Sequence, residues 1–531
     1  MRYRVLNISQ WVGEEDAVLT RRAAERLGVP PSSLKAVAVL RRSLDARKKG
    51  HPRFIVNLEV ELDGEVASGL SGVEPAPATP PPPARVRAPD LPPVILGAGP
   101  AGLFCAHALL ERGVRSVVVD RGKLVAPRRV DVARLMRAGE LDPESNMNFG
   151  EGGAGAYTDG KLGTRIHHPG VRKVVELFAH YGGVSRILEE GKPHVGSDLL
   201  PGAVSALRRD LERAGCEFHF GARAVDVLVS GGRVRALALS DGRSIPCDRL
   251  VLAPGNSARE LFELFASRGW PIEAKPFAVG FRVEHPQALI DHIQYGSAAG
   301  RPGLPPADYR LADNPKVDGT PRGVFSFCMC PGGVVVPTPT EPGMQCTNGM
   351  SNSLRSSPFA NAGLVVAVGQ ADFEAAGLKG PLAGLLWQRE WERRAYLLGG
   401  GRFMAPAQRI TDYLAGRLGQ RPGRSSYPPG LTHADLSTLF PAAVQAALRA
   451  GLRTFERQMR GYLSSEAILV GVETRTSSPC RLVRDPASLQ SPGLSGLYPA
   501  GEGAGYAGGI VSSAVDGLRV ADAICAELAP A

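Results

Sequence analysis

The chain has 531 residues, of which 44% are hydrophobic and 21% charged, which predicts a soluble globular protein of about three domains. No stretch approaches the roughly 18 uninterrupted apolar residues that span a bilayer, and the first residues lack the apolar core of a secretory signal. The eight cysteines are scattered and nothing in the sequence indicates export, so we expect a cytoplasmic protein with reduced thiols. The net charge is +10.

Residues 1–73 are predicted to form a small basic α+β domain. The expected elements are a strand, an amphipathic helix and two further strands, at Arg2–Ile8, about Glu15–Leu27, Lys35–Leu44 and Arg53–Leu62. Residues 1–57 hold twelve Lys or Arg against five Asp or Glu. We interpret this excess as a solvated basic face, with a redox or acidic partner as the alternative. RNA is disfavoured because no aromatic residues are interleaved.

A proline-rich segment follows at residues 74–92. Its composition favours an extended, semi-rigid spacer over packed structure. We therefore expect a domain boundary here.

The segment "VILGAGPAGLFCAHALLERGVRSVVVDRG" reads as strand, glycine turn, helix and second strand. Gly97 permits the sharp turn, Gly99 lets a pyrophosphate approach, and Gly102 lets the helix pack closely on the strand. Phosphates would then lie at the helix N-terminus. Asp120 ends the second strand, where a carboxylate can bind ribose hydroxyls. The pattern predicts a dinucleotide site.

Near the C-terminus, "GLYPAGEGAGYAGGIVSSAVDGLRVADAI" forms another strand, glycine turn and helix. No second strand with an acidic end follows it, so it is not a second complete nucleotide unit. We interpret it as a further helix N-terminus directed at the same cofactor. The many glycines of "NFGEGGAGAYTDGKLGTRIHH", beside Lys161, suggest backbone close to the same cofactor, although such a segment is also typical of a flexible loop. The segment "DRLVLAPGNSARE" resembles the Ala-Thr-Gly stretch with which flavoproteins return the chain from a strand toward FAD, with Pro254 in place of the usual threonine.

This arrangement resembles FAD enzymes of the glutathione reductase and p-hydroxybenzoate hydroxylase type. The segments "KPFAVGFRVEHPQ", "GVFSFCMCPGGVVV", "TNGMS" and "VETRTSSPCR" are further similar to one bacterial family of FAD-dependent dehydrogenases with a small ferredoxin-like domain in front. The resemblance implies non-covalently bound FAD and a Rossmann-like α/β fold, with Glu502 near the ribityl chain. The implied cofactor-binding residues are Gly97, Gly99, Pro100, Ala101, Gly102, Asp120, Arg121, Gly122, Gly153, Lys161, Leu162, Ala224, Gly255, Gly501, Glu502, Gly503, Gly508, Gly509 and Ile510.

On this resemblance the FAD-binding domain is discontinuous. It comprises residues 93–264 and 466–531, with an inserted α+β substrate or cap domain at 265–465. No second strand–GxGxxG–helix unit lies between 150 and 480, so NAD(P)H, if it is the electron donor, would bind only transiently. No redox-active CxxC lies near the first motif, and Cys105 is interpreted as a packing residue.

Arg282 and Glu284 lie two residues apart in a predicted strand and are expected to share one face. They are candidates to anchor an anionic substrate and move a proton, and the alternative is a surface ion pair. Glu473 and Arg475 are also two residues apart and are candidates with the same alternative. His167 and His168 are interpreted as loop residues.

The stretch "FSFCMCPGGVVV" places Cys328 and Cys330 before a Pro-Gly-Gly turn. We interpret it first as a loop against the flavin pocket and second as a pair of catalytic thiols. A metal site is disfavoured because the spacing, even with Cys346, fits no usual zinc or iron–sulfur pattern. A disulfide between alternate residues of a regular strand would be strained.

The predicted function is an FAD-dependent oxidoreductase that transfers a hydride or electrons between the flavin and an unidentified small anionic substrate. The alternatives are an FAD-dependent RNA-modifying enzyme whose basic N-terminal domain docks the RNA, and a non-catalytic flavin redox sensor.

Overall fold

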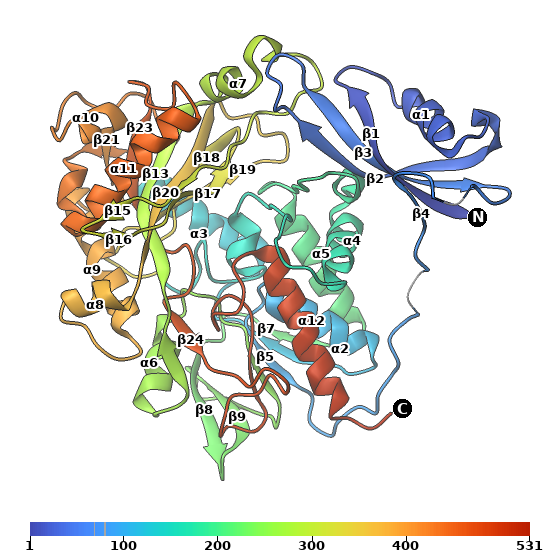
Figure 1. Cartoon of the computed structure of the whole chain (residues 1–531). Helices are drawn as coiled ribbons and strands as arrows, with labels where there is room; N and C mark the ends of the chain where they lie inside the picture. Colours follow the sequence, from blue (N-terminus) through green and yellow to red (C-terminus); the bar gives the residue numbers. More distant parts are fainter. Residues whose placement is uncertain (68, 79–80, 531) are drawn as a thin grey trace.

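The computed structural model describes residues 1–67, 69–78 and 81–530 of the chain. Its largest elements are a four-stranded N-terminal sheet, a five-stranded parallel sheet and a seven-stranded sheet. Figure 1 shows these three assemblies in one compact arrangement. The predicted fold is confirmed: a Rossmann-like α/β unit, an inserted α+β region and a small N-terminal α+β domain.

The N-terminal sheet has the strand order β2-β3-β1-β4, and helix α1 packs on it. A ferredoxin-like unit has two helices, of which the described residues form one. The polar, glycine-containing segment between β3 and β4 contains no helix in its described residues. The elements are β1 (Arg2–Trp11), α1 (Ala17–Leu27), β2 (Leu34–Asp45), β3 (Arg53–Leu62) and β4 (Val73–Pro75).

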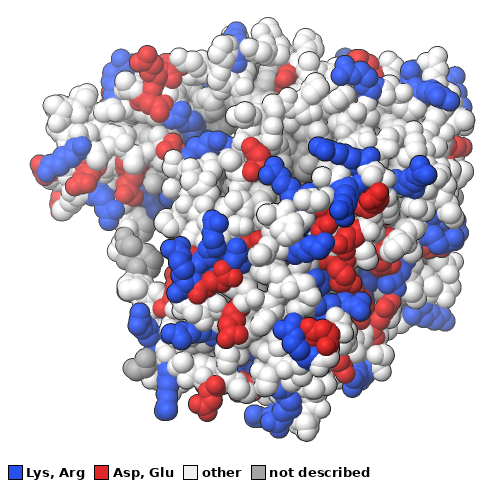
Figure 2. Space-filling view, turned by 180° about the vertical axis from the view of Figure 1, so that it is seen from behind, with Lys and Arg blue, Asp and Glu red and all other residues white. Residues whose placement is uncertain are grey.

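The basic residues of this domain are largely paired with carboxylates. Arg22 contacts Glu14 at 2.8 Å and Arg42 contacts Asp16 at 2.8 Å. On the face seen in Figure 2, Lys and Arg are interspersed with Asp and Glu rather than forming a field of one sign. The structure therefore adds no support for a nucleic-acid surface, and the partner of this domain stays a prediction.

The N-terminal domain is anchored to the rest of the chain by backbone hydrogen bonds. The Arg42 amide donates to the Glu189 carbonyl, and the Gly191 amide donates to the Arg42 carbonyl at 2.8 Å. The Gly50 amide donates to the Tyr295 carbonyl at 2.9 Å. Strand β2 therefore contacts the Rossmann-like unit, and the loop between β2 and β3 contacts the central region.

The parallel sheet has the order β25-β11-β5-β6-β7, so the last strand of the chain lies at its edge. Its strands are β5 (Val94–Leu96), β6 (Val117–Val119), β7 (Glu217–His219), β11 (Leu250–Leu252) and β25 (Leu497–Pro499). The associated helices are α2 (Pro100–Glu111), α3 (Val125–Ala138), α4 (Gly170–Gly182), α5 (Leu200–Arg213), α6 (Arg259–Ser267) and α12 (Ile510–Ala526). A separate antiparallel sheet follows β7, with β8 (Ala224–Ser230), β9 (Arg233–Leu239) and β10 (Ser244–Pro246).

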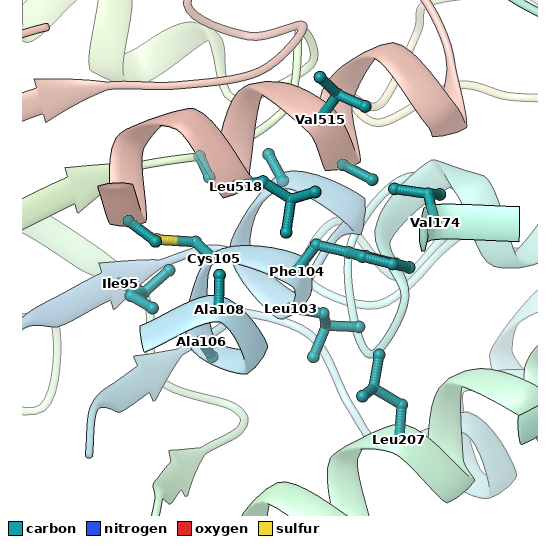
Figure 3. Packing of buried hydrophobic residues seen from close by; sticks show 14 of the residues in the cluster. Ile95, Leu103, Phe104, Cys105, Ala106, Ala108, Val174, Leu207, Val515 and Leu518 are labelled. Atoms are coloured by element: carbon teal, nitrogen blue, oxygen red, sulfur yellow. The ribbon is translucent and has the colours of Figure 1, made fainter. Parts of the chain in front are cut away.

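Helices α2 and α12 cross at very close range in the main core. A Cβ added to Gly517 on α12 would lie 2.1 Å from the Ala101 carbonyl oxygen on α2. Figure 3 shows Cys105 within this apolar contact, between α2 and α12 and near Ile95. The interpretation of Cys105 as a packing residue is confirmed, because its side chain is fully buried in the core.

The central region is built on a seven-stranded sheet of order β14-β17-β20-β13-β23-β21-β22. Only β21 and β22 are parallel neighbours. The strands are β13 (Phe277–Pro286), β14 (Ala312–Asp313), β17 (Val324–Cys330), β20 (Phe359–Val368), β21 (Ala405–Arg409), β22 (Leu431–His433) and β23 (Ile468–Glu473). Where the chain enters and leaves this sheet, β12 (Ile272–Ala274) pairs with β24 (Cys480–Leu482).

The two faces of this sheet have different partners. Helices α7 (Gln287–Tyr295), α9 (Ala383–Leu398) and α11 (Ala442–Gln458) bury an apolar cluster that includes Phe277, Val279, Phe281 and Val283 of β13. Because side chains alternate along a strand, Arg282 and Glu284 project to the opposite face. The hairpin of β18 (Gly333–Pro337) and β19 (Thr347–Ser351) covers that face. None of the helices in the described residues combines the length and apolar character that a bilayer crossing requires.

The α2–α12 contact predicts a specific sensitivity to glycine replacement. Gly517→Ala should lower the free energy of unfolding by about 1–3 kcal/mol, because the new methyl group overlaps backbone that cannot yield cheaply. Chemical denaturation monitored by circular dichroism measures the effect. The matched control is Gly202→Ala on α5, where an added Cβ meets nothing within 4 Å. Equal stability of both variants would show that the helices can separate without cost.

Candidate functional site

The turn after β5 can be formed only with glycine at two positions. Gly97 has φ +111°, and a Cβ on it would lie 2.1 Å from the Ala253 carbonyl oxygen. A Cβ on Gly102 would lie 1.9 Å from the Gly97 carbonyl oxygen. Gly99 differs, because the nearest heavy atom to its Cβ position is the Gly153 Cα at 3.8 Å. The space beside Gly99 is therefore open, and α2 begins at the next residue.

Asp120 lies buried at the end of β6 and fixes the turn. Its carboxylate accepts hydrogen bonds from the Ala98 amide at 2.9 Å and from the Gly122 amide at 2.8 Å. Arg121 stacks on the Phe149 ring at 4.2 Å and pairs with Glu144. A surface cleft beside this turn is lined by Arg121, Lys123, Glu144, Ser145, Gly221, Arg223 and Ser240. Ala224, the first residue of β8, is buried just beyond this cleft.

The glycine-rich loop at 146–157 is fixed by hydrogen bonds from Arg128 on α3. This guanidinium is fully buried and donates to the carbonyls of Asn146, Glu151 and Gly153 at 2.7–2.8 Å. The Glu151 side chain is also buried, and it accepts hydrogen bonds from the Val125 amide at 2.7 Å, Ser205 at 3.0 Å and Arg208 at 2.7 Å. The loop is thus an ordered part of the site, and its interpretation as a flexible surface loop is wrong for residues 146–153.

The C-terminal turn packs on the end of β11. A Cβ on Gly503 would lie 2.4 Å from the Gly255 carbonyl oxygen, so these two backbones need glycine to meet. The Gly501 amide donates to Asp516 at 2.8 Å, and Asn256 donates to Glu502 at 2.7 Å. Burial raises the pKa of Glu502 to about 7, although Lys275 and Asn256 oppose the shift.

Three distant segments meet around Gly155. A Cβ at this residue would lie 3.1 Å from Pro100 at the start of α2 and 3.5 Å from Ile510 at the start of α12. The N-termini of both helices therefore face the glycine-rich loop. Gly508 and Gly509 precede α12 and are exposed, and a Cβ on Gly508 would meet nothing within 4 Å.

Lys161 follows the glycine-rich loop in the chain and lies within a series of polar contacts. Its ammonium is 2.7 Å from Asp159, whose second carboxylate oxygen lies 3.1 Å from Nε2 of His194. The ammonium also contacts Sγ of Cys330 at 3.7 Å. Burial alone would raise the pKa of Asp159, but Lys161 and His194 hold it below its ordinary value. The neighbouring Leu162 is buried.

Arg282 is fully buried on the hairpin-facing side of β13. It forms an ion pair with Glu473 at 3.3 Å. The alternative of a surface ion pair between Arg282 and Glu284 is wrong, because both side chains are buried and Glu284 accepts hydrogen bonds from Ser426. A Cβ on Gly349 would lie 2.4 Å from the guanidinium, so glycine makes room for it. Its other acceptors are Asn361 at 3.0 Å, the carbonyls of Phe327 at 3.3 Å and Cys328 at 3.0 Å, and Asn348 at 3.2 Å.

Cys328 occupies a β-bulge in β17. The β17–β20 pairing shifts between Phe327 and Cys330, and Cys328 has φ +44°, a left-handed conformation that non-glycine residues rarely adopt. Its carbonyl accepts a hydrogen bond from the Cys330 thiol at 3.4 Å as well as the one from Arg282. Cys328 is half-buried, whereas Cys330 is fully buried.

The two thiols differ in acidity. The pKa of Cys328 is lowered to about 5, first by its interaction with the Cys330 side chain and then by the positive charges of Lys161 and Arg282. Interaction with Cys328 and burial raise the pKa of Cys330 well above its ordinary value. The pair therefore holds one readily lost proton and one retained proton.

The remaining candidates lie apart from the thiols. Glu284 accepts hydrogen bonds from Ser426 instead of pairing with Arg282, and burial raises its pKa. Arg475 pairs with the buried Glu392 at 2.9 Å, not with Glu473. His167 and His168 are exposed loop residues, as interpreted. The described residues contain no group of three or more His, Cys, Asp or Glu side chains placed to hold a metal ion.

Comparison with known proteins gives matches over nearly the whole chain. Residues 276–476 match the family described as FAD-dependent protein, C-terminal domain-like, residues 90–144 match an FAD binding domain, and residues 3–61 match a domain of unknown function, DUF8436. An uncharacterized protein of Clostridium beijerinckii is 38% identical over 99% of this chain and 98% of its own length. This chain belongs to a family of FAD-dependent oxidoreductases.

More distant similarities are partial. A menaquinone reductase of Mycolicibacterium smegmatis is 28% identical over 39% of this chain and 49% of its own length. Among solved structures, a glycine oxidase from Bacillus cereus is 12% identical and aligns with a TM-score of 0.34 over 83% of this chain and 96% of its own. The halogenase PltM has a TM-score of 0.37 at 8% identity, over 82% of this chain and 70% of its own.

The geometry of this flavoprotein fits its cofactor, FAD. The open space at Gly99 would be filled by any Cβ, and it lies beside the α2 N-terminus, whose free amides favour a pyrophosphate. The second helix N-terminus, at Ile510, meets the same loop through Gly155. The individual cofactor contacts of the nineteen residues named from the sequence stay predictions.

Sequence reasoning missed three buried residues of the site: Arg128, Asp159 and His194. They stand outside any recognised spacing, since they act on loops that approach only in the folded chain. Glu473 was noted, but with Arg475 rather than Arg282 as its neighbour. Buried charge in an otherwise apolar strand such as "ILVGVE" was the one available signal.

The Arg128 contacts predict a role in cofactor retention. Arg128→Met should weaken FAD binding by roughly tenfold or more, because three loop carbonyls lose their donor. Release of flavin on dialysis, measured by fluorescence, gives the affinity. Arg129→Met, on the exposed neighbouring residue, is the matched control. Unchanged FAD binding in a folded Arg128→Met protein would contradict the prediction, and circular dichroism establishes folding.

The acidity of Cys328 predicts a pH profile. A thiolate alkylates and a thiol does not, so the rate of iodoacetamide modification should rise through about pH 5 and then level off. In the denatured chain the same rise should occur near pH 8.5, the ordinary value for cysteine. Cys330→Ala removes the largest cause of the shift and should move the rise upward. Peptide mass spectrometry locates the label, and a native profile that rises only near pH 8.5 would refute the assignment.

Proposed function

We propose that this FAD-dependent oxidoreductase oxidises or reduces a small anionic substrate at the flavin. When bound, the isoalloxazine supplies hydride or electron transfer, and the protein supplies position, charge and exclusion of water. The observation that carries the proposal is the convergence of the glycine-rich loop, both helix N-termini and the Lys161–Cys330–Arg282 cluster on one region of the fold.

Lys161 is the proposed contact for the anion. Its side chain is 36% exposed, whereas Arg282 is buried and its three guanidinium nitrogens already have acceptors. In this proposal Arg282 positions the bulge of β17 and Lys161 meets the substrate. Asp159 keeps the ammonium in place at 2.7 Å.

Two carboxyl groups, those of the buried Glu473 and the half-buried Glu502, are proposed to hold and release protons. Burial raises the pKa of Glu473 to about 7, against the opposing effect of Arg282, and the pKa of Glu502 is also about 7. Each can therefore hold or release a proton near neutral pH. Glu473 contacts the cluster through Arg282, and Glu502 lies on the C-terminal turn.

NAD(P)H remains a candidate electron donor that binds transiently. In the described part of residues 150–480, β7 and β11 belong to the five-stranded parallel sheet already described, and the other sheets are antiparallel apart from the β21–β22 pair. This part therefore forms no second parallel nucleotide-binding sheet. NAD(P)H would therefore have to bind at the flavin site transiently, without a Rossmann domain of its own.

The test is anaerobic reduction of the purified yellow protein. NADH, NADPH and a panel of carboxylate metabolites are added in turn, and the loss of flavin absorbance identifies the donor. We expect at least one compound to bleach the flavin. A protein that neither contains nor takes up FAD would overturn the proposal, and a flavin reduced by dithionite alone would favour the redox-sensor alternative.

Gly99→Val supplies a variant that separates cofactor loss from unfolding. The new side chain enters the open space beside the α2 N-terminus and should abolish FAD binding with the thermal stability of the cofactor-free protein unchanged. Gly423→Val, in an exposed loop where a Cβ meets nothing within 4 Å, is the matched control.

A further inference from the structure

Two cysteines and two cations form a cluster that cofactor binding alone does not require. Arg282 lies 3.8 Å and Lys161 3.7 Å from Sγ of Cys330, while Arg282 also donates to the Cys328 carbonyl. We propose that Cys328 and Cys330 are a reactive dithiol that reduces small anionic disulfides, with Cys328 as the attacking sulfur.

The bulge in β17 changes the strand geometry that would otherwise disfavour a disulfide between Cys328 and Cys330. In a regular strand, alternate residues lie too far apart for a comfortable disulfide. Here the β17–β20 register slips by one residue between Phe327 and Cys330, and Cys328 turns into the left-handed region. The Cys330 thiol consequently reaches back to the Cys328 carbonyl at 3.4 Å, and the two side chains interact.

Exposure assigns the two roles. Cys328 is half-buried and can meet a substrate, whereas Cys330 is fully buried beside it. The charges of Lys161 and Arg282 favour a thiolate and also attract an anionic disulfide. Asp159, Glu473 and Glu502 are the carboxyl groups within electrostatic range of the cluster, and Lys161 or Arg282 neutralises the first two.

The reaction balances with the substrate disulfide as oxidant. The Cys328 thiolate attacks one sulfur of R–S–S–R, forms a mixed disulfide and expels one RS⁻. Cys330 then passes its proton to the first RS⁻, attacks Sγ of Cys328 and expels the second RS⁻, leaving an internal Cys328–Cys330 disulfide, one RSH and one RS⁻. The substrate gains two electrons and the protein loses two.

Return to the dithiol rests on the proposed function. The internal disulfide must take up two electrons and two protons, which that function would provide from the reduced cofactor. Cys328 affects the pKa of Glu502, so the bulge lies within electrostatic range of the C-terminal turn. The first half of the cycle needs only the two cysteines and is testable without turnover.

The experiment uses the full-length protein, freed of reductant under anaerobic conditions, and dithiobis-nitrobenzoate as an anionic aromatic disulfide. We expect two thionitrobenzoate ions per chain in a fast phase, at least about fivefold faster than free cysteine near pH 6. Mass spectrometry should find an internal disulfide in the peptide that holds both cysteines.

Single replacements distinguish the steps. Cys330→Ser should release one ion and keep a stable mixed disulfide on Cys328, and Cys328→Ser should abolish the fast phase. Cys247→Ala is the matched control, because that thiol is buried elsewhere and burial raises its pKa to about 12. Lys161→Met should slow the fast phase.

Several outcomes would overturn the inference: no fast phase in the native chain, a fast phase that survives in Cys328→Ser, or two ions released from Cys330→Ser. The flavin spectrum, recorded on the same samples, checks folding and cofactor content. A protein with the fast phase but without FAD would support the dithiol and refute the proposed function. A protein whose FAD is bleached by a donor but that shows no fast phase would support the proposed function and refute the dithiol.

Discussion

The buried guanidinium of Arg282 is the interaction on which the central region depends. It connects β13, β17, β19 and β20 through side-chain and carbonyl acceptors, and it pairs with Glu473 on β23. A charge withdrawn from water is costly unless it is paired and fully hydrogen-bonded. This arrangement meets that requirement, and the bulge at Cys328 carries two of the carbonyl acceptors, those of Phe327 and Cys328.

The cofactor half of the molecule follows a different principle. There the backbone approaches itself or a ligand, and glycine is placed where a Cβ has no room. Gly97, Gly102, Gly503 and Gly517 are each blocked by a carbonyl oxygen within 2.4 Å of the Cβ position. Gly99 is the exception, because its Cβ position is open, and that difference separates a glycine needed for packing from one that leaves space for a ligand.

These two principles explain what could be predicted from the sequence. The strand–glycine–helix pattern around Gly97 is local, so a short stretch of chain specified the parallel sheet, α2 and the dinucleotide site. The C-terminal turn was found in the same way. The Arg282–Glu473 pair joins strands that are remote in sequence, and the spacing rule pointed instead to Glu284. The bulge at Cys328 was equally hidden, since nothing in "FSFCMC" indicates that its register slips against β20.

The docking of β2 on residues 189–191 means that the N-terminal domain is not an independent appendage. Arg42 satisfies the backbone of this loop, and three residues later the same loop presents His194 to Asp159, the partner of Lys161. Deleting the domain would leave an amide and a carbonyl of the loop to be solvated by water. The position of Lys161 thus depends in part on β2, a strand of the N-terminal domain, through the loop that carries His194 and through Asp159.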